Sequence, residues 1–222
     1  MTRNTAVVVG ATGLVGRYLA HVLAEDAFYD RVLLLTRRPA EPPEIMTKTE
    51  NVYADFGRIE ELDLPGATHA FSCLGTTLRA AGSRDAFRRV DFGYVVAFAR
   101  AARRAGARHL SVISSVGADA RASSFYLRVK GEMESAVSEL GFEELHIFKP
   151  SVLLGKRPEN RPFESAAAAI SRGLEWLMLG PLRKYRPMPA PLLASAMAAA
   201  GERGGPGRHI HHYQDIVRLA GV

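Results

Sequence analysis

Residues 5–16 read TAVVVGATGLVG, and this stretch decides the fold. Residues 5–9 are mostly β-branched, which favours a buried strand. A G-x-x-G-x-x-G turn follows at Gly10, Gly13 and Gly16, and the apolar side chains of residues 14–25 recur at helical spacing. The stretch therefore predicts a strand, a glycine turn and a helix in direct succession.

The position of this turn predicts a dinucleotide site. Gly10 permits the tight turn, Gly13 lets the backbone approach a pyrophosphate, and Gly16 lets the helix pack closely on the strand. The free N–H groups at the start of the helix can then receive the phosphates. We expect the turn to bind the coenzyme through Gly10, Thr12, Gly13, Leu14, Val15 and Gly16. The alternative is an ordinary glycine-rich turn without a ligand.

Strands and helices continue to alternate beyond this motif. Further strands are predicted at residues 31–36, 67–74, 108–114 and 145–148, and a weaker one at residues 50–53, while helical patterns cover residues 85–105 and 125–140. Strands that do not alternate polar with apolar residues are typical of a parallel sheet covered by helices on both faces. The predicted fold class is α/β, a Rossmann-type doubly wound parallel sheet with a small C-terminal helical cap.

The chain of 222 residues is long enough for one full-sized core. We expect a single NAD(P)-binding domain over residues 1–222, with residues 1–154 as the cofactor-binding core and residues 155–222 as a C-terminal substrate or cap segment. Prolines interrupt that segment between helical patterns at residues 163–179 and 191–202, so it is too broken for a core of its own. Its apolar side chains predict a mostly apolar substrate.

The chain is basic, with a formal net charge of +6, and only five of its 29 basic residues are lysine. This charge favours anionic partners. The arginines are scattered, however, and no nucleic-acid-binding motif accompanies them. We therefore expect a phosphate-bearing small molecule and no nucleic acid as partner, and the sequence leaves a homodimer open.

The sequence carries no signal for export or for membrane insertion. No apolar run reaches the roughly 18 residues of a membrane span, and no separate signal-peptide core precedes the first strand pattern. The only cysteine, Cys73, excludes a disulfide framework and a cysteine-based zinc site. We therefore expect a cytoplasmic protein without membrane insertion.

The histidines predict no metal site. The group near the C-terminus, His209, His211 and His212, has no partner carboxylate or cysteine at ligand spacing. His109 and His146 fall in predicted strands, where we expect them to be structural residues with satisfied hydrogen bonds.

Two arginines end the second predicted strand. Where an NAD-binding protein usually presents a carboxylate to the adenosine ribose, this sequence has Arg37 and Arg38. A guanidinium pairs with a phosphate through charge-assisted, often bidentate hydrogen bonds. These residues therefore favour NADP(H) over NAD(H), and the alternative is two solvated arginines at the start of a loop.

A Y-x-x-x-K pattern opens the helical segment after the fifth predicted strand. Tyr126 and Lys130 are four residues apart, so both side chains lie on one helix face, and Ser114 and Ser115 end the preceding strand. A lysine ammonium stabilises a nearby phenolate, which lets a tyrosine exchange protons at neutral pH. The pattern predicts hydride transfer between nicotinamide C4 and a carbonyl carbon. A packed tyrosine beside a solvated lysine is the alternative.

In combination these segments resemble the short-chain dehydrogenases/reductases, and within them the atypical branch. They look like the Tat-interacting-protein subgroup of NADPH-binding oxidoreductases. The segments that carry the resemblance are residues 10–16, 37–38, 71–77 (FSCLGTT), 87–91 (FRRVD), 114–119 (SSVGAD), 125–132 (FYLRVKGE) and 150–155 (PSVLLG).

The resemblance implies further coenzyme contacts. It implies that the adenosine half lies against Asp55, Phe56, Cys73, Leu74 and Gly75. It also implies that Lys130 binds the nicotinamide ribose and that the nicotinamide meets residues 150–152, with Pro150 and Val152 among them.

The resemblance leaves two functions open. By the family's usual pattern Ser115 is the catalytic serine, although Ser114 stays a candidate, and Asp91 stands where many members have an asparagine. Intact serine, tyrosine and lysine favour an oxidoreductase. Because the atypical branch includes redox sensors, the alternative is an NADPH-binding regulatory or redox-sensing interaction protein with little or no catalysis.

Overall fold

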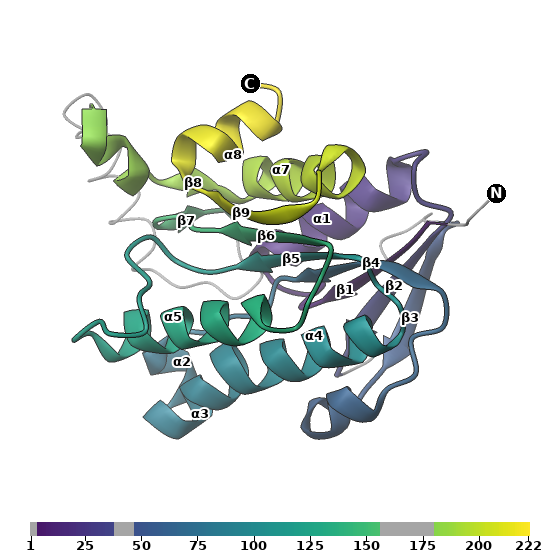
Figure 1. Ribbon diagram of the computed structural model, residues 1–222, viewed down its shortest axis with the longest axis horizontal. Coiled ribbons are helices and arrows are strands. Elements are labelled where there is room, and N and C mark those ends of the chain that lie inside the picture. The colour runs from purple at the N-terminus through teal and green to yellow at the C-terminus, as the bar shows by residue number, and fades with distance from the viewer. Residues whose placement is uncertain (1–3, 38–46, 156–179) are drawn as a thin grey trace.

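A seven-stranded parallel sheet forms the centre of the protein (Figure 1). The computed structural model describes residues 4–37, 47–155 and 180–222. The strands run in the order β3-β2-β1-β4-β5-β6-β9, and all neighbouring pairs are parallel. Their bounds are β1 Thr5–Val9, β2 Arg31–Thr36, β3 Thr49–Tyr53, β4 Ala67–Ser72, β5 His109–Ile113, β6 Glu144–Phe148 and β9 Gly207–His211. The strand order reverses between β1 and β4, which confirms the predicted doubly wound fold.

Helices cover both faces of this sheet (Figure 1). One face carries α1 (Leu14–Glu25), α7 (Ala190–Arg203) and α8 (Tyr213–Leu219), and the other carries α4 (Val95–Arg104) and α5 (Phe125–Ser138). The shorter elements are η1 (Phe56–Glu61), α2 (Leu78–Ala81), α3 (Arg84–Arg88), η2 (Arg89–Tyr94), η4 (Gly180–Tyr185) and the paired strands β7 (Leu153–Leu154) and β8 (Met188–Pro189). Among the described helices, none combines the length and apolar character of a membrane span.

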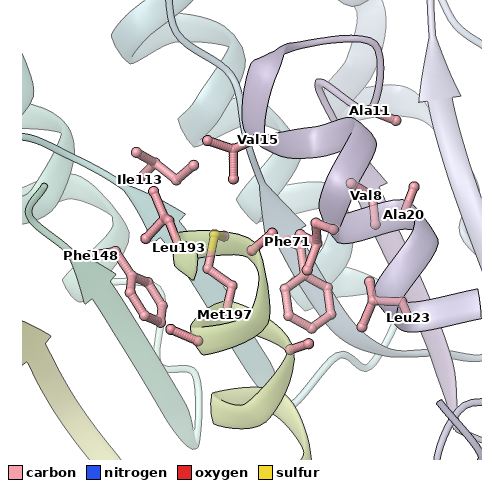
Figure 2. Packing of buried hydrophobic residues seen from close by; sticks show 14 of the residues in the cluster. Val8, Ala11, Val15, Ala20, Leu23, Phe71, Ile113, Phe148, Leu193 and Met197 are labelled. Atoms are coloured by element: carbon pink, nitrogen blue, oxygen red, sulfur yellow. The ribbon is translucent and has the colours of Figure 1, made fainter. Parts of the chain in front are cut away.

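The two faces of the sheet bury separate apolar cores, because successive strand residues point to opposite sides. On the α4 and α5 side, Val7 and Val9 of β1 join one core. On the other side, Val8 joins a second core that α7 fills with Leu193 and Met197. Figure 2 shows Met197 between Phe71 and Phe148, with the α1 side chains beyond. The two cores fix the sheet between its helical layers.

The C-terminal part of the chain adds to the same sheet. β9 pairs with β6 in parallel register, so that His146 lies opposite His209, and α7 packs along α1. The predicted helix over residues 191–202 corresponds to α7. The helix predicted over residues 163–179 lies outside the described residues.

The long helix predicted over residues 85–105 is divided. α3 ends at Arg88, a π-helical segment (η2) follows, and α4 begins at Val95. The side chain of Asp91 is fully buried in the π-helical segment and accepts a hydrogen bond from the backbone N–H of Thr76. π-helical turns are frequent at functional sites, and this one holds Asp91 against Thr76 in the segment that follows β4.

Candidate active site

The glycine turn forms the base of the site, between β1 and α1. Gly10 has a φ of +81°, and a Cβ at this position would meet the backbone of Cys73 at 2.7 Å. A Cβ at Gly16 would lie 2.1 Å from the carbonyl oxygen of Gly10. Among the described residues no side chain caps the start of α1, which leaves its first N–H groups available to an anion. The turn is therefore as compact as a pyrophosphate cradle requires.

A pocket lies beside the turn, where β2 and β3 end. Its volume is about 430 Å³, and its lining residues are Arg37, Tyr53, Ala54, Asp55 and Phe56. The exposed Arg37 guanidinium lies 5.7 Å from the centre of the Phe56 ring, and the Asp55 carboxylate accepts a hydrogen bond from Gly57 N at 2.9 Å. The structure thus brings together Arg37, Asp55 and Phe56, whereas Arg38 lies outside the described residues.

A buried ion pair lies at the carboxyl ends of the central strands. Lys130 Nζ lies 2.7 Å from Asp91 Oδ1, and both side chains are almost fully buried. The ammonium also donates to the carbonyl oxygen of Ile113, at the end of β5, at 3.3 Å. A Cβ on Gly75 would come within 3.8 Å of the same ammonium. Lys130 is thereby held where β4 and β5 end, with Gly75 directly beside it.

Cys73 directly follows β4, two residues before Gly75. Its backbone N–H donates to the carbonyl oxygen of Val9 at 2.9 Å, which holds the segment against the glycine turn. The residue is half-buried, and burial raises the pKa of its thiol to about 12. At neutral pH the thiol is protonated and unreactive.

Tyr126 stands in the first turn of α5, four residues before Lys130. It is half-buried, and its ring packs against Phe87 with the centroids 5.5 Å apart. Ser115 follows β5 and is half-buried; its hydroxyl makes a long contact of 3.4 Å with the carbonyl oxygen of Val116. A weak contact of this length leaves the Ser115 hydroxyl free to bind another partner.

Ser114 has a different environment. Its hydroxyl donates to Glu134 Oε1 at 2.5 Å in the protein interior. Lys149 Nζ donates to Glu134 Oε2 at 3.0 Å and to the carbonyl oxygen of Ala118 at 3.0 Å. This network ties α5, the end of β6 and the loop after β5 together, so the two serines that the sequence could not separate have different contacts.

Glu134 and Lys149 are not among the site residues predicted from the sequence. Glu134 continues the four-residue step of Tyr126 and Lys130 along α5, which was a readable signal. The contact with Lys149, which precedes Pro150, depends on the pairing of β5 with β6. At this junction Val116 N donates to the carbonyl oxygen of Pro150 at 2.9 Å, while Val152 is 60% exposed at the edge of the site.

Comparisons with known proteins identify the family. A family model described as NAD(P)H-binding matches residues 10–154. Protein HTATIP2 of Rattus norvegicus is 38% identical over 167 residues, which cover 74% of this chain and 69% of that protein. Protein FMP52, mitochondrial, of Coccidioides immitis is 31% identical over 229 residues, which cover 98% and 93%. The structure of human epimerase family protein SDR39U1 with NADPH matches with a TM-score of 0.65 at 15% identity, covering 93% of this chain and 72% of that one.

The names of the relatives correct one expectation. FMP52 proteins from several fungi are named mitochondrial, so the expected cytoplasmic location is wrong. That expectation rested on missing export and membrane signals, and such an absence does not distinguish one internal compartment from another.

The family resemblance of the sequence is confirmed. The matched residues 10–154 contain the glycine turn, the pocket at the end of β2 and the pair of Lys130 with Asp91. The solved structure of SDR39U1 has the same fold. The chain belongs to the NAD(P)H-binding family, together with the HTATIP2 and FMP52 proteins.

Proposed function

We propose that the protein is an NADP(H)-dependent oxidoreductase that interconverts a carbonyl compound and an alcohol. The observation that carries the proposal is the buried Lys130 ammonium, held at the ends of β4 and β5 and one helical turn after Tyr126. When bound, the coenzyme supplies or accepts the hydride. The mostly apolar substrate expected from residues 155–191 remains part of the proposal, and residues 156–179 lie outside the described ones.

The residues present fit a phosphorylated dinucleotide. Gly10 and Gly16 have no room for a Cβ, so that the turn brings its backbone N–H groups close to a ligand. Arg37 lies in the pocket of about 430 Å³ next to this turn, where it can pair with a 2′-phosphate on the adenosine ribose. Phe56 offers its ring to the adenine. This combination favours NADP(H) over NAD(H).

The proton would pass through Tyr126. In the reducing direction the Tyr126 hydroxyl donates its proton to the carbonyl oxygen of the substrate, and in the oxidising direction its phenolate accepts the proton of the alcohol. Lys130 provides a positive charge that stabilises the phenolate and binds the nicotinamide ribose. The Ser115 hydroxyl donates to the substrate oxygen and orients it, a task for which the buried contact with Glu134 makes Ser114 less suited.

One observation favours the alternative function. Asp91 neutralises the Lys130 ammonium at 2.7 Å, and a neutralised lysine stabilises a phenolate less. An NADPH-binding regulatory protein would tolerate this pairing, because it needs the coenzyme and not the proton transfer. The two functions differ in whether removal of the Tyr126 hydroxyl has any consequence.

The experiment compares wild type with Tyr126→Phe in NADPH oxidation with a panel of aldehydes, ketones and quinones. We expect the substitution to lower turnover by about 100-fold or more and to leave NADPH affinity unchanged, since it deletes only a hydroxyl. Tyr213→Phe on α8 is the matched control and should retain full turnover. Unchanged turnover in Tyr126→Phe contradicts the proposed mechanism. Tight NADPH binding with no turnover on any substrate favours the regulatory alternative.

A further inference from the structure

A cluster of histidines lies beneath α7, on the face of the sheet that α1 and α7 cover. The rings of His69, His109, His146 and His211 come from four adjacent strands, β4, β5, β6 and β9. Consecutive rings lie 5.4, 4.9 and 5.1 Å apart between centroids. Polar rings are uncommon in such a buried layer, and the mechanism proposed above uses none of them.

Three side chains of this cluster form a donor set. His109, Glu144 and His146 each offer one ligand atom, and the three atoms lie within 4.8 Å of one another. His109 Nδ1 is 3.3 Å from Glu144 Oε2. This separation is long for an N–H···O hydrogen bond, but it is close to the roughly 3.3 Å between two ligands on a tetrahedral zinc ion with bonds of about 2.0–2.1 Å.

His146 supplies the atom that an ordinary hydrogen-bonded cluster does not explain. His146 is 3% exposed, and its Nε2 has no hydrogen-bond partner among the described residues. Its Nδ1 lies 2.9 Å from His211 Nε2. Because a buried N–H without an acceptor is rare, the favoured tautomer carries the proton on Nδ1 and leaves a bare lone pair on Nε2. Such a lone pair is a metal ligand.

Gly204, directly after α7, packs closely against two of the donors. A Cβ at Gly204 would lie 2.8 Å from His146 Nε2, 3.1 Å from Glu144 Oε2 and 2.3 Å from the carbonyl oxygen of Ala200. A larger residue at this position would therefore cover both ligand atoms. On the far side, His109 Nε2 contacts the Ser111 hydroxyl at 2.8 Å, which orients the ring as outer partners of metal ligands do.

We propose that His109, Glu144 and His146 bind a Zn²⁺ ion that links β5 and β6 beneath the end of α7. Two imidazoles and one carboxylate are a donor set that Zn²⁺ accepts, with a fourth position for water. The proposal departs from our expectation of no metal site, in which His109 and His146 were structural residues. The site is independent of the proposed oxidoreductase function, because His109 and Glu144 begin their strands while the coenzyme pocket lies where the strands end.

The test uses the untagged full chain, treated with a chelator and dialysed. Zn²⁺ is titrated calorimetrically, and Co²⁺ is added as a spectroscopic probe of the coordination geometry. We expect one Zn²⁺ per chain and the intense visible absorption of four-coordinate Co²⁺. Glu144→Gln should weaken Zn²⁺ binding by about 100-fold and abolish the Co²⁺ bands. Glu143→Gln makes the same charge change on the adjacent exposed residue and should alter neither result.

A second pair of variants separates loss of a ligand from loss of the fold. His146→Gln removes the bare Nε2, and His21→Gln removes an exposed histidine on α1. Only the former should lose Zn²⁺, while circular dichroism and NADPH binding remain as in wild type. Absence of saturable Zn²⁺ binding to the wild type overturns the proposal. Binding that Glu144→Gln and His146→Gln leave unchanged also overturns it, because the ion would then be bound by surface groups.

Discussion

Arg37 is the residue on which the coenzyme preference depends in our proposal. Its guanidinium is exposed at the end of β2 and stacks near Phe56. A 2′-phosphate would give it a charged partner that NADH lacks. We expect Arg37→Glu to weaken NADPH binding by about 10- to 100-fold, the range for charge-assisted hydrogen bonds. NADH binding should change far less, and paired calorimetric titrations of the two coenzymes measure the difference.

The control for this substitution is Arg58→Glu. Arg58 is exposed on η1 and pairs with Glu61, so its replacement makes the same change of charge near the pocket without touching its lining. If both variants lose NADPH affinity equally, the effect is one of general charge, and Arg37 does not set the preference.

Cys73 gives a prediction about reactivity. A thiol whose pKa is raised to about 12 is present as thiolate at pH 8 only in a very small fraction, and the thiolate is the nucleophile. We expect iodoacetamide to alkylate the native chain at pH 8 about 100-fold or more slowly than the chain unfolded in urea. Mass spectrometry of timed samples follows the reaction. Equal rates in the two states would mean that Cys73 is open to solvent and near its ordinary pKa.

At the scale of helices and strands, the sequence pattern predicted the elements that depend on contacts between neighbouring residues. The first strand, the glycine turn and α1 follow from consecutive residues, and α1 begins and ends at the residues expected, Leu14 and Glu25. The π-helical segment between α3 and α4 depends on Asp91 meeting Thr76 and Lys130 from other elements. Spacing within one helix cannot reveal such partners, so the sequence predicted one continuous helix.

The same limit applies to side chains that meet across strands. Ser114 contacts Glu134, and Glu134 contacts Lys149, only because α5 crosses β5 and β6. Likewise, His109 reaches Glu144 through the register of β5 with β6, in which the two residues lie opposite each other. The candidate residues of the active site could be predicted because they belong to sequence motifs. These clusters could not be predicted without knowing which strands pair.

Gly131 on α5 shows that packing can outweigh helix propensity. Alanine at an exposed helix position is favoured over glycine by about 1 kcal/mol. At Gly131, however, a Cβ would lie 2.2 Å from both Ala120 N and the carbonyl carbon of Asp119, in the loop that follows Ser115. We therefore expect Gly131→Ala to lower the free energy of unfolding by about 1–3 kcal/mol, measured by urea denaturation.

The matched control is Gly93→Ala in the π-helical segment. Its nearest contact would be the carbonyl oxygen of Arg88 at 4.0 Å, an ordinary van der Waals distance. This variant should be as stable as wild type or more so. If Gly131→Ala is also neutral, the loop moves freely, and close packing on α5 does not hold Ser115 in place.

For the molecule as a whole, the described helices α7 and α8 belong to the same apolar core as the glycine turn and α1. α7 buries Leu193 and Met197 against Phe71, Phe148 and the α1 side chains (Figure 2). Each such side chain contributes about 1.5–3 kcal/mol when fully buried, and a domain of this kind has a net stability of only about 5–15 kcal/mol. Loss of the helix would therefore consume most of the stability of the fold.

This balance predicts the behaviour of a chain that ends after Leu154. It retains the glycine turn, Arg37, Tyr126 and Lys130, but it lacks α7, α8 and the edge strand β9, so that α1 alone remains of the three helices on that face of its sheet. We expect this fragment to show no cooperative thermal transition and no NADPH binding, measured by circular dichroism and calorimetry, whereas the full chain shows both. Leu193→Ala in the full chain should retain NADPH binding and lose about 2–5 kcal/mol of stability. A fragment that melts cooperatively and binds NADPH like the full chain would instead make residues 155–222 a separable cap, because the coenzyme site would then form without the core beneath α7.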